Sequence, residues 1–303
     1  MSDTRPQPLG FIGLGNIGGP LAANLVADGH ELLVHDTDPG RTEALCALGA
    51  TSAGSPEAVG AGAACTFLSL PSPAVMESVA RRWLEGAAGS GKILVDLSTN
   101  APATVRRTGA ALSDAGCRLV EAPLTGGAVG ARTRKLVFIV GGEDGAVAEV
   151  RPLLDSLGRA TVHLGGLGSG NVGKLVNSLV AFATQWVSLE GMALAAKHDL
   201  DLRTLVEMIR VSGAATPYLD RRVEQITERG RPAEFALALA AKDAGLMVEA
   251  GLEVGAPMPV AAALQQVLTF AVAQGLGARD IGDLVEVAER AAATELRLRP
   301  PDA

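Results

Sequence analysis

The stretch LGFIGLGNIG, residues 9–18, decides the fold of this 303-residue chain. A short apolar run leads into glycines spaced as G-x-G-x-x-G, at Gly13, Gly15 and Gly18, and a helical pattern follows. In a strand–turn–helix unit the first glycine makes the tight turn, the second lets the backbone approach a pyrophosphate, and the third lets the helix pack on the strand. Without that context the glycines would predict only a flexible loop. With it they predict a dinucleotide-binding loop at a helix N-terminus, whose remaining residues are Leu14, Asn16 and Ile17.

The next apolar run, ELLVHD, closes on Asp36. A carboxylate at this position can accept hydrogen bonds from a ribose 2′-hydroxyl but would repel the 2′-phosphate of NADP. We therefore expect NAD, with NADP as the second choice. Two alternatives stay open: Asp36 could simply begin a turn with Asp38 and Pro39, and Arg41 is a nearby cation that could serve a 2′-phosphate.

Up to about residue 165, short apolar runs alternate with helical patterns, which predicts βαβ units and a doubly wound parallel sheet. These runs are LGFIGL, ELLVHD, CTFLSL, KILVDLS, RLVEAPL, KLVFIV and ATVHL. Most of the 37 glycines also lie in this part, and the later chain consists of Ala/Leu/Val/Glu-rich helical segments. We expect an α/β fold with a flexible tail at 1–7, a Rossmann-type domain at 8–165 and an all-helical substrate and oligomerisation domain at 166–303, joined by a long helix from about Asn171 to Lys197.

The composition limits the partners. With 48% hydrophobic residues, 19% charged residues and a formal net charge of -7, the chain is typical of a globular protein that binds neither nucleic acid nor an anionic membrane. Its N-terminal residues contain no apolar signal core, so we expect a cytoplasmic location. The isolated Cys46, Cys65 and Cys117 fit small buried side chains in a reducing compartment, and the scattered histidines predict no metal site.

Two further strand ends should reach the same crevice, because ligands of open α/β sheets bind outside the carboxyl ends of the strands. Leu70 and Pro71 end the run CTFLSLP, and Ser98 and Thr99 end KILVDLST. For the second segment simple helix capping is an alternative, with Asn100 as the cap and Pro102 in the first turn.

The segment EAPLTGG ends another apolar run with a hydroxyl and two glycines, at Thr125, Gly126 and Gly127. Side-chain and backbone donors of this kind can bind a carboxylate. A loop of ordinary turn residues is the alternative.

The segment GSGNVGKLVNSLV, residues 168–180, runs from a glycine-rich turn into a helical pattern. Lys174, Asn177 and Ser178 share one face at i, i+3 and i+4. We expect the opposite face to be the packed stripe, and the polar face to be either solvated or catalytic. The packed stripe would consist of Val172, Leu175, Val176, Leu179 and Val180.

Across its whole length the chain resembles the β-hydroxyacid dehydrogenase family. Four segments match the family motifs in order: GFIGLGNIGGPLAANL, DLSTNAP, EAPLTGGAVGA and GSGNVGKLVNS. A fifth, FALALAAKDAGLMVEAG, is similar to the helix from which a family lysine reaches the cofactor, here Lys242. Alone, Lys242 and Asp243 would predict only an exposed ion pair.

The resemblance implies hydride transfer between a nicotinamide cofactor and a small β-hydroxyacid such as 3-hydroxyisobutyrate, in a homodimer or homotetramer. It makes Lys174 the catalytic residue, which either moves the proton of the alcohol or stabilises charge on its oxygen. The same resemblance assigns substrate contacts to Ser98, Thr125, Gly126, Gly127, Asn177 and Ser178, and cofactor contacts to Leu70, Pro71, Thr99 and Lys242.

The chain departs from the family pattern at four positions. Ser178 replaces an Asn, Glu121 an Asp, Thr125 a Ser, and Arg134 a Gly. Arg134 could face solvent or reach a second anionic group on the substrate. Two other functions stay open: an imine or semialdehyde reductase using NADPH, and a noncatalytic cofactor-binding scaffold.

Overall fold

The computed structural model describes residues 7–216, 219, 226 and 229–298. All but one residue of the expected tail at 1–7 lies outside this part. Tyr218 also lies outside this part. The sequence around it predicts either a cover for the substrate pocket or a surface loop. The described chain divides into two compact units, of which the first ends at Leu175 and the second begins at Val176.

The described residues of the first unit form a nine-stranded sheet in the order β3-β2-β1-β4-β5-β6-β8-β7, with β9 paired to β8. Strands β1 to β6 are parallel where they pair. Each apolar run expected to be a strand contains one, which confirms the α/β prediction. The strands are β1 (Leu9–Ile12), β2 (Leu32–His35), β3 (Thr51–Ser52), β4 (Cys65–Leu68), β5 (Ile93–Asp96), β6 (Arg118–Glu121), β7 (Leu124–Thr125), β8 (Leu136–Gly142) and β9 (Gly158–His163).

The sheet departs from a purely parallel arrangement at β8, which runs antiparallel to both β6 and β7. The connection from β7 to β8 is residues 126–135, and it includes the six-residue helix α6 (Gly127–Arg132). A parallel crossover needs a dozen or more residues, so the chain must return in the opposite direction here. Apolar runs carry no sign of strand direction, which is why the sequence pattern did not reveal this reversal.

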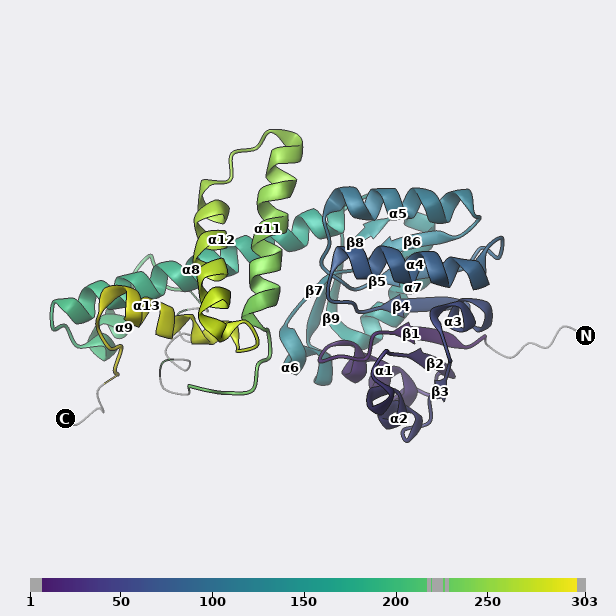
Figure 1. Ribbon diagram of the computed structural model, residues 1–303, viewed down its shortest axis with the longest axis horizontal. Helices are drawn as coiled ribbons and strands as arrows, with labels where there is room; N and C mark the ends of the chain where they lie inside the picture. Colours follow the sequence, from purple (N-terminus) through teal and green to yellow (C-terminus); the bar gives the residue numbers. More distant parts are fainter. Residues whose placement is uncertain (1–6, 217–218, 220–225, 227–228, 299–303) are drawn as a thin grey trace, which may run out of the picture. The chain divides into compact units, whose positions relative to one another are not determined.

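Helices cover both faces of the sheet (Figure 1). One face packs on α1 (Gly18–Ala27), α2 (Pro39–Cys46), α6 and α7 (Asp144–Leu157), and the other on α3 (Pro56–Gly62), α4 (Pro73–Ala87) and α5 (Pro102–Asp114). Phe11 and Phe67 stack on the first face with ring centroids 5.8 Å apart. On the second, Trp83 is fully buried and donates to Thr66 Oγ1 at 2.9 Å.

In the part of the second unit that the structure describes, the regular elements are helices, as predicted. They are the later turns of α8 (Ser169–Lys197), then α9 (Leu202–Arg210), α11 (Leu237–Val254), α12 (Pro259–Ala271), the π-helix η1 (Val272–Leu276), the 3₁₀-helix η2 (Ile281–Asp283) and α13 (Leu284–Ala292). By length and hydropathy α8 and the segment Pro259–Leu276 could each cross a membrane. That is weak support for a membrane location, because core helices of soluble proteins pass the same test.

The buried face of α8 differs from the prediction. Of the predicted packed stripe, Leu175 is buried, but Val172, Val176 and Val180 are exposed; Ser178, on the predicted polar face, is 2% exposed. The buried positions continue along the helix at Phe182, Gln185, Leu189 and Met192. A polar residue can take a core position where hydrogen-bond partners exist, and Gln185 does so by donating to Ile281 O at 2.7 Å. Apolar periodicity alone was therefore right about Leu175 and wrong about three of the valines.

Candidate functional site

The G-x-G-x-x-G loop connects β1 to α1, as predicted. Gly13 has φ 91°, and a Cβ there would lie 2.3 Å from Ser69 O. At Gly18 a Cβ would lie 1.9 Å from Gly13 O, so only glycine lets the helix start this close to the strand. These two glycines are required by the turn and by the packing.

Gly15 has no such internal requirement. Its φ is not positive, and a Cβ there would meet only Arg41 Nη1, at 3.5 Å. The helix that follows, α1, has Ile17 as its N-cap residue, without a side-chain cap. Because open space and uncapped helix N–H groups are what a pyrophosphate requires, the loop fits the phosphates of a dinucleotide.

Asp36 lies at the end of β2 and contacts this loop directly. Its Oδ2 accepts the backbone N–H of Leu14 at 2.6 Å, and its Oδ1 accepts that of Asp38 at 2.8 Å. Asp38 in turn caps α2 through Gly40 N. Asp36 thus begins the turn with Asp38, as the alternative interpretation predicted. It also places a carboxylate beside the glycine fingerprint. Arg41 Nη1 lies 3.8 Å from Asp36 Oδ2.

The ends of β4 and β5 are also joined. Leu70 N donates to Ser98 Oγ at 2.9 Å, so the two strand ends that the sequence singled out lie together. Pro71 is exposed and Thr99 is half-buried. Since the fingerprint loop contacts Ser69 O, the structure brings together the predicted cofactor residues of β1, β2, β4 and β5.

Asn100 does not cap the following helix, contrary to the capping alternative. The N-cap residue of α5 is Ala101, and no side chain caps it. Instead Asn100 is fully buried, and its Nδ2 donates to Asp96 Oδ2 at 2.6 Å. The side chain turns back into the sheet because a buried carboxylate is available there.

A buried polar network, which the sequence did not predict, ties these strand ends to the start of α8. Glu121, at the end of β6, accepts hydrogen bonds from Gly168, Gly170 and Asn171. Asn171 Oδ1 accepts Asn100 N at 2.7 Å, which links Glu121 to Asp96. The available signal was a carboxylate at the end of each of two buried strands, DLST and EAPL, with no basic residue in either segment.

Burial raises the pKa of both carboxyls in this network. For Asp96 desolvation raises the pKa to about 6, against hydrogen bonds from Ser98 and Asn100 that lower it. Desolvation also raises the pKa of Glu121, although hydrogen bonds from Asn171 and from backbone N–H groups oppose the rise. These carboxyls therefore hold their protons more tightly than exposed ones.

Lys174 follows Asn171 by one turn of α8 and is half-buried in the first unit. Asn177, which is half-buried, and Ser178, which is buried, lie on the next turn and belong to the second unit. Lys242 lies in α11 of the second unit, with its Nζ 3.1 Å from Asp243 Oδ1. Asp243 is 1% exposed, so the interpretation of this pair as exposed is wrong.

The segment Thr125–Gly127 forms the turn from β7 into α6. Gly126 has φ 124° and Gly127 has φ 63°, conformations that favour glycine. The turn therefore accounts for both glycines, and a role in binding a substrate carboxylate remains a prediction. Thr125 is half-buried and pairs with Val137 of β8.

Arg134 takes neither of its two predicted roles. Its guanidinium donates to both oxygens of Asp28, at 2.7 and 2.8 Å, and to Ser156 O and Asn24 O. Its φ of 55° accounts for the glycine usual in the family at this position. Arg134 thus links α1 to α7, and its donors are used within the fold.

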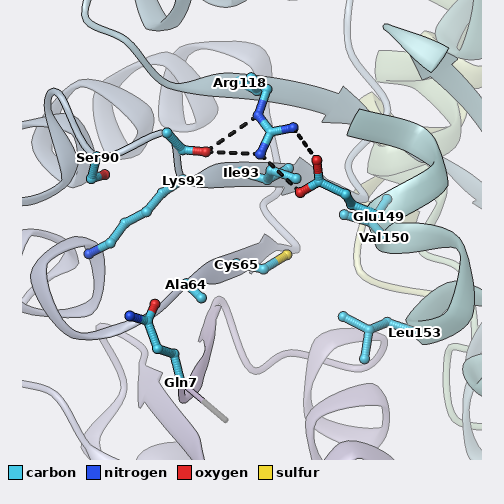
Figure 2. A pocket seen from close by; sticks show the side chains of 11 residues that line it. Gln7, Ala64, Cys65, Ser90, Lys92, Ile93, Arg118, Glu149, Val150 and Leu153 are labelled. Atoms are coloured by element: carbon cyan, nitrogen blue, oxygen red, sulfur yellow. Dashed lines mark hydrogen bonds and ion pairs between the residues drawn. The ribbon is translucent and has the colours of Figure 1, made fainter. Parts of the chain in front are cut away.

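A cavity of about 400 Å³ lies at the opposite edge of the sheet, beside the amino ends of β4, β5 and β6. Figure 2 shows that Arg118 in this cavity points at Glu149, to which its guanidinium donates. The guanidinium also donates to the Gly91 carbonyl. Burial raises the pKa of the nearby Cys65 thiol to about 12, so it is no nucleophile. Ligands of this fold class bind at the carboxyl ends of the strands, so this cavity is not the candidate site.

The chain is similar to known proteins over most of its length. Residues 8–165 match the NAD-binding domain of 6-phosphogluconate dehydrogenase, and residues 168–288 match the NAD-binding region of NADP-dependent 3-hydroxyisobutyrate dehydrogenase. The chain is 30% identical to 2-(hydroxymethyl)glutarate dehydrogenase of Eubacterium barkeri, over 93% of this chain and 95% of that protein. It is 33% identical to 3-hydroxyisobutyrate dehydrogenase of Pseudomonas aeruginosa, over 84% and 88%.

Solved structures show the same similarity. A structure of Mycobacterium tuberculosis 3-hydroxyisobutyrate dehydrogenase with L-serine has a TM-score of 0.81 and 27% identity, covering 93% of this chain and 98% of that one. An imine reductase from Myxococcus stipitatus has a TM-score of 0.65 at 19% identity, a likeness in fold alone. Together the two matched regions span parts of both units, and each of the relatives named here matches most of the chain.

Proposed function

Because the chain belongs to the β-hydroxyacid dehydrogenase family, we propose that it oxidises a small β-hydroxyacid reversibly with NAD. The single observation that carries this proposal is the convergence of four segments in the first unit. The fingerprint loop, Asp36, the Leu70–Ser98 contact and the first turn of α8 are joined by hydrogen bonds or close backbone contacts. Lys174 lies one turn beyond the last of these.

We propose that Lys174 is the general acid and base. A bound nicotinamide ring supplies the hydride acceptor in oxidation and the hydride donor in reduction. The ammonium of Lys174 would donate a hydrogen bond to the substrate hydroxyl oxygen and hold or move its proton as the alcohol becomes a carbonyl. The half-buried position of Lys174, one turn beyond the buried network that holds Asn171, supports this role.

We propose a preference for NAD over NADP. Asp36 has one carboxylate oxygen on the fingerprint loop, where a 2′-phosphate would meet its negative charge. Arg41 is the residue that would favour NADP, but it is half exposed and pairs with Asp38 at 3.3 Å. The carboxylate of Asp36 therefore favours NAD, and the opposing effect of Arg41 is reduced because its charge is partly neutralised by Asp36 and Asp38.

We propose that the substrate is a small acid with one carboxylate. The family resemblance assigns its carboxylate to Ser98, Thr125, Gly126 and Gly127, and further contacts to Asn177 and Ser178. Several relatives act on such acids by name, among them 2-hydroxy-3-oxopropionate reductase of Escherichia coli. Arg134 does not contribute a second anion site, because Asp28 occupies it.

A substrate screen tests the proposal. Reduction of NAD and of NADP would be followed with 3-hydroxyisobutyrate, glycerate, threonate, 4-hydroxybutyrate, and hydroxymethyl and sulfonated analogues. We expect turnover with at least one monocarboxylate β-hydroxyacid, faster with NAD. Imine reduction with NADPH, or cofactor binding without any turnover, would replace this proposal with one of the two alternatives.

We further propose a homodimer or homotetramer in the cytoplasm. Val180, Val187 and Leu194 are each more than half exposed along α8, which is typical of a helix that packs on another subunit. The three free cysteines fit a reducing compartment. Sedimentation velocity would measure the assembly, and cell fractionation the location.

A further inference from the structure

We propose that Glu121 is a positioning residue: its carboxylate fixes the first turn of α8 against the sheet and thereby orients Lys174. This inference rests on the proposed function, because Lys174 is the residue that it serves. The contacts that support it lie in the first unit, which contains β6, the glycine-rich turn and the first turns of α8 through Leu175.

The carboxylate of Glu121 is completely buried and accepts four hydrogen bonds. Gly168 N and Gly170 N donate to Oε1, the latter at 2.9 Å. Asn171 donates to Oε2 twice, from its backbone N at 3.0 Å and from its Nδ2 at 2.6 Å. No positive side chain takes part in these contacts, so the charge of Glu121 is balanced by oriented N–H groups.

Three of these donors, on Gly168, Gly170 and Asn171, are backbone N–H groups of the kind that an α-helix leaves without partners at its start. In other helices of this unit the N-cap side chain accepts such an N–H group, as Ser55 does for α3 and Ser72 for α4. In α8 the hydroxyl of Ser169 instead donates backwards to Gly166 O at 2.7 Å. Glu121 therefore caps α8 from a strand 47 residues earlier in the chain, and a negative charge at this end also complements the helix dipole.

The fit around the carboxylate leaves no space for the helix to shift. A Cβ on Gly141 would lie 2.2 Å from Glu121 Oε1, and a Cβ on Gly170 would lie 2.7 Å from Ile139 O. The first turn of α8 thus contacts the backbone of β8 directly. Since Lys174 follows one turn later, the register set at Gly170 and Asn171 decides where its ammonium points.

The same contacts connect the helix to the predicted substrate and cofactor segments. Asn171 Oδ1 accepts Asn100 N, Asn100 Nδ2 donates to Asp96, and Asp96 Oδ1 accepts Ser98 N at 3.0 Å. Each member of this chain is buried. Removing the charge of Glu121 would therefore disturb the placement of Lys174 relative to Ser98, not only the stability of the helix.

The test compares Glu121→Gln with Glu149→Gln as a matched control. Glu149 is a largely exposed carboxylate that pairs with Arg118 at the other end of β6. With the hydroxyacid found in the substrate screen, E121Q should lower kcat at least tenfold, leave the NAD dissociation constant within twofold, and raise the primary deuterium isotope effect on kcat. E149Q should change none of these. A folded E121Q protein with the wild-type kcat and isotope effect would overturn the proposal.

Two further measurements cover the other outcomes. If E121Q does not fold, Glu121→Asp, which keeps the charge on a shorter side chain, should fold and show the same changes to a smaller degree; wild-type kinetics in E121D would then count against the proposal. If the wild-type protein oxidises no hydroxyacid, the proposed function fails, and the rate of Lys174 acetylation against pH still reports on positioning. A displaced ammonium should change the pH profile of Lys174 acetylation in E121Q and, to a smaller degree, in E121D, but not in E149Q; an unchanged profile would refute the inference.

Discussion

Lys174 combines a half-buried position with a fixed helical register, which is the environment that a proton-transferring amine requires. Replacing it with Ala should lower kcat by about 10²–10⁴-fold, the usual contribution of a general acid or base. NAD binding should persist, because the fingerprint residues are untouched. The exposed Lys197 at the end of the same helix provides a control, since Lys197→Ala should keep full activity. Equal turnover in the two variants would remove Lys174 from the mechanism.

Asp36 should determine the choice of cofactor through its charge. Asp36→Asn keeps an oxygen that can accept the Leu14 N–H but removes the repulsion of a 2′-phosphate. We expect the ratio of kcat/KM for NAD to that for NADP to fall at least tenfold, mainly through improved use of NADP. Asp38→Asn, in the same turn but capping α2, should leave the ratio close to that of the wild type. The measurement contradicts our assignment if both substitutions change it equally.

Asp96 should give the stability of the fold an unusual pH dependence. Its pKa of about 6 in the folded state exceeds the ordinary value of 3.8, so the folded protein binds more protons than the unfolded chain between these values. Stability should therefore fall as the pH rises from about 4 to 6. In Asp96→Asn the Tm measured across this range should decline less steeply. An equally steep decline would mean that Asp96 titrates normally.

Among the elements, the β1–α1 loop contains two glycines, Gly18 and Gly15, that are needed for different physical reasons. Gly18→Ala places a methyl group 1.9 Å from Gly13 O and should destabilise the whole unit. Gly15→Ala meets nothing closer than 3.5 Å, so it should fold with a Tm near that of the wild type and bind NAD at least tenfold more weakly. Thermal unfolding and a fluorescence titration with NAD would distinguish them. Unchanged NAD affinity in G15A would show that the phosphates bind elsewhere.

Short apolar runs predicted seven of the nine strands; they missed β3, whose two residues are exposed, and did not separate β7 from β6. They could not predict the reversal at β8, since strand direction depends on the length of the connection and not on side-chain polarity. For α8 the helix was correct but its buried face was not. Val172 and Val176 are exposed while Ser178 is buried, because the environment of a helix is set by what packs on it.

For the molecule as a whole, NAD binding to the first unit should raise stability by mass action. At a concentration of 100 times Kd the gain is about 2.7 kcal/mol. Hydrogen exchange should show the added protection at β1, α1 and β2, and the helices α12 and α13 serve as the internal reference. Asp36→Ala should reduce the gain at the same NAD concentration. Protection spread evenly over both units would mean that the binding energy is not local to the fingerprint.

The sequence by itself determined the class of the fold, the fingerprint loop, the strand ends that carry Leu70 and Ser98, and Lys174 as the residue to test. These features depend on local spacing and on the glycines that a tight turn requires. Only the tertiary structure decided that Arg134 is bound to Asp28 and that Asn100 turns into the sheet. It alone showed that Glu121 caps α8. These roles depend on partners distant in the chain, because a buried polar side chain must form hydrogen bonds and only the folded chain brings its partners within reach.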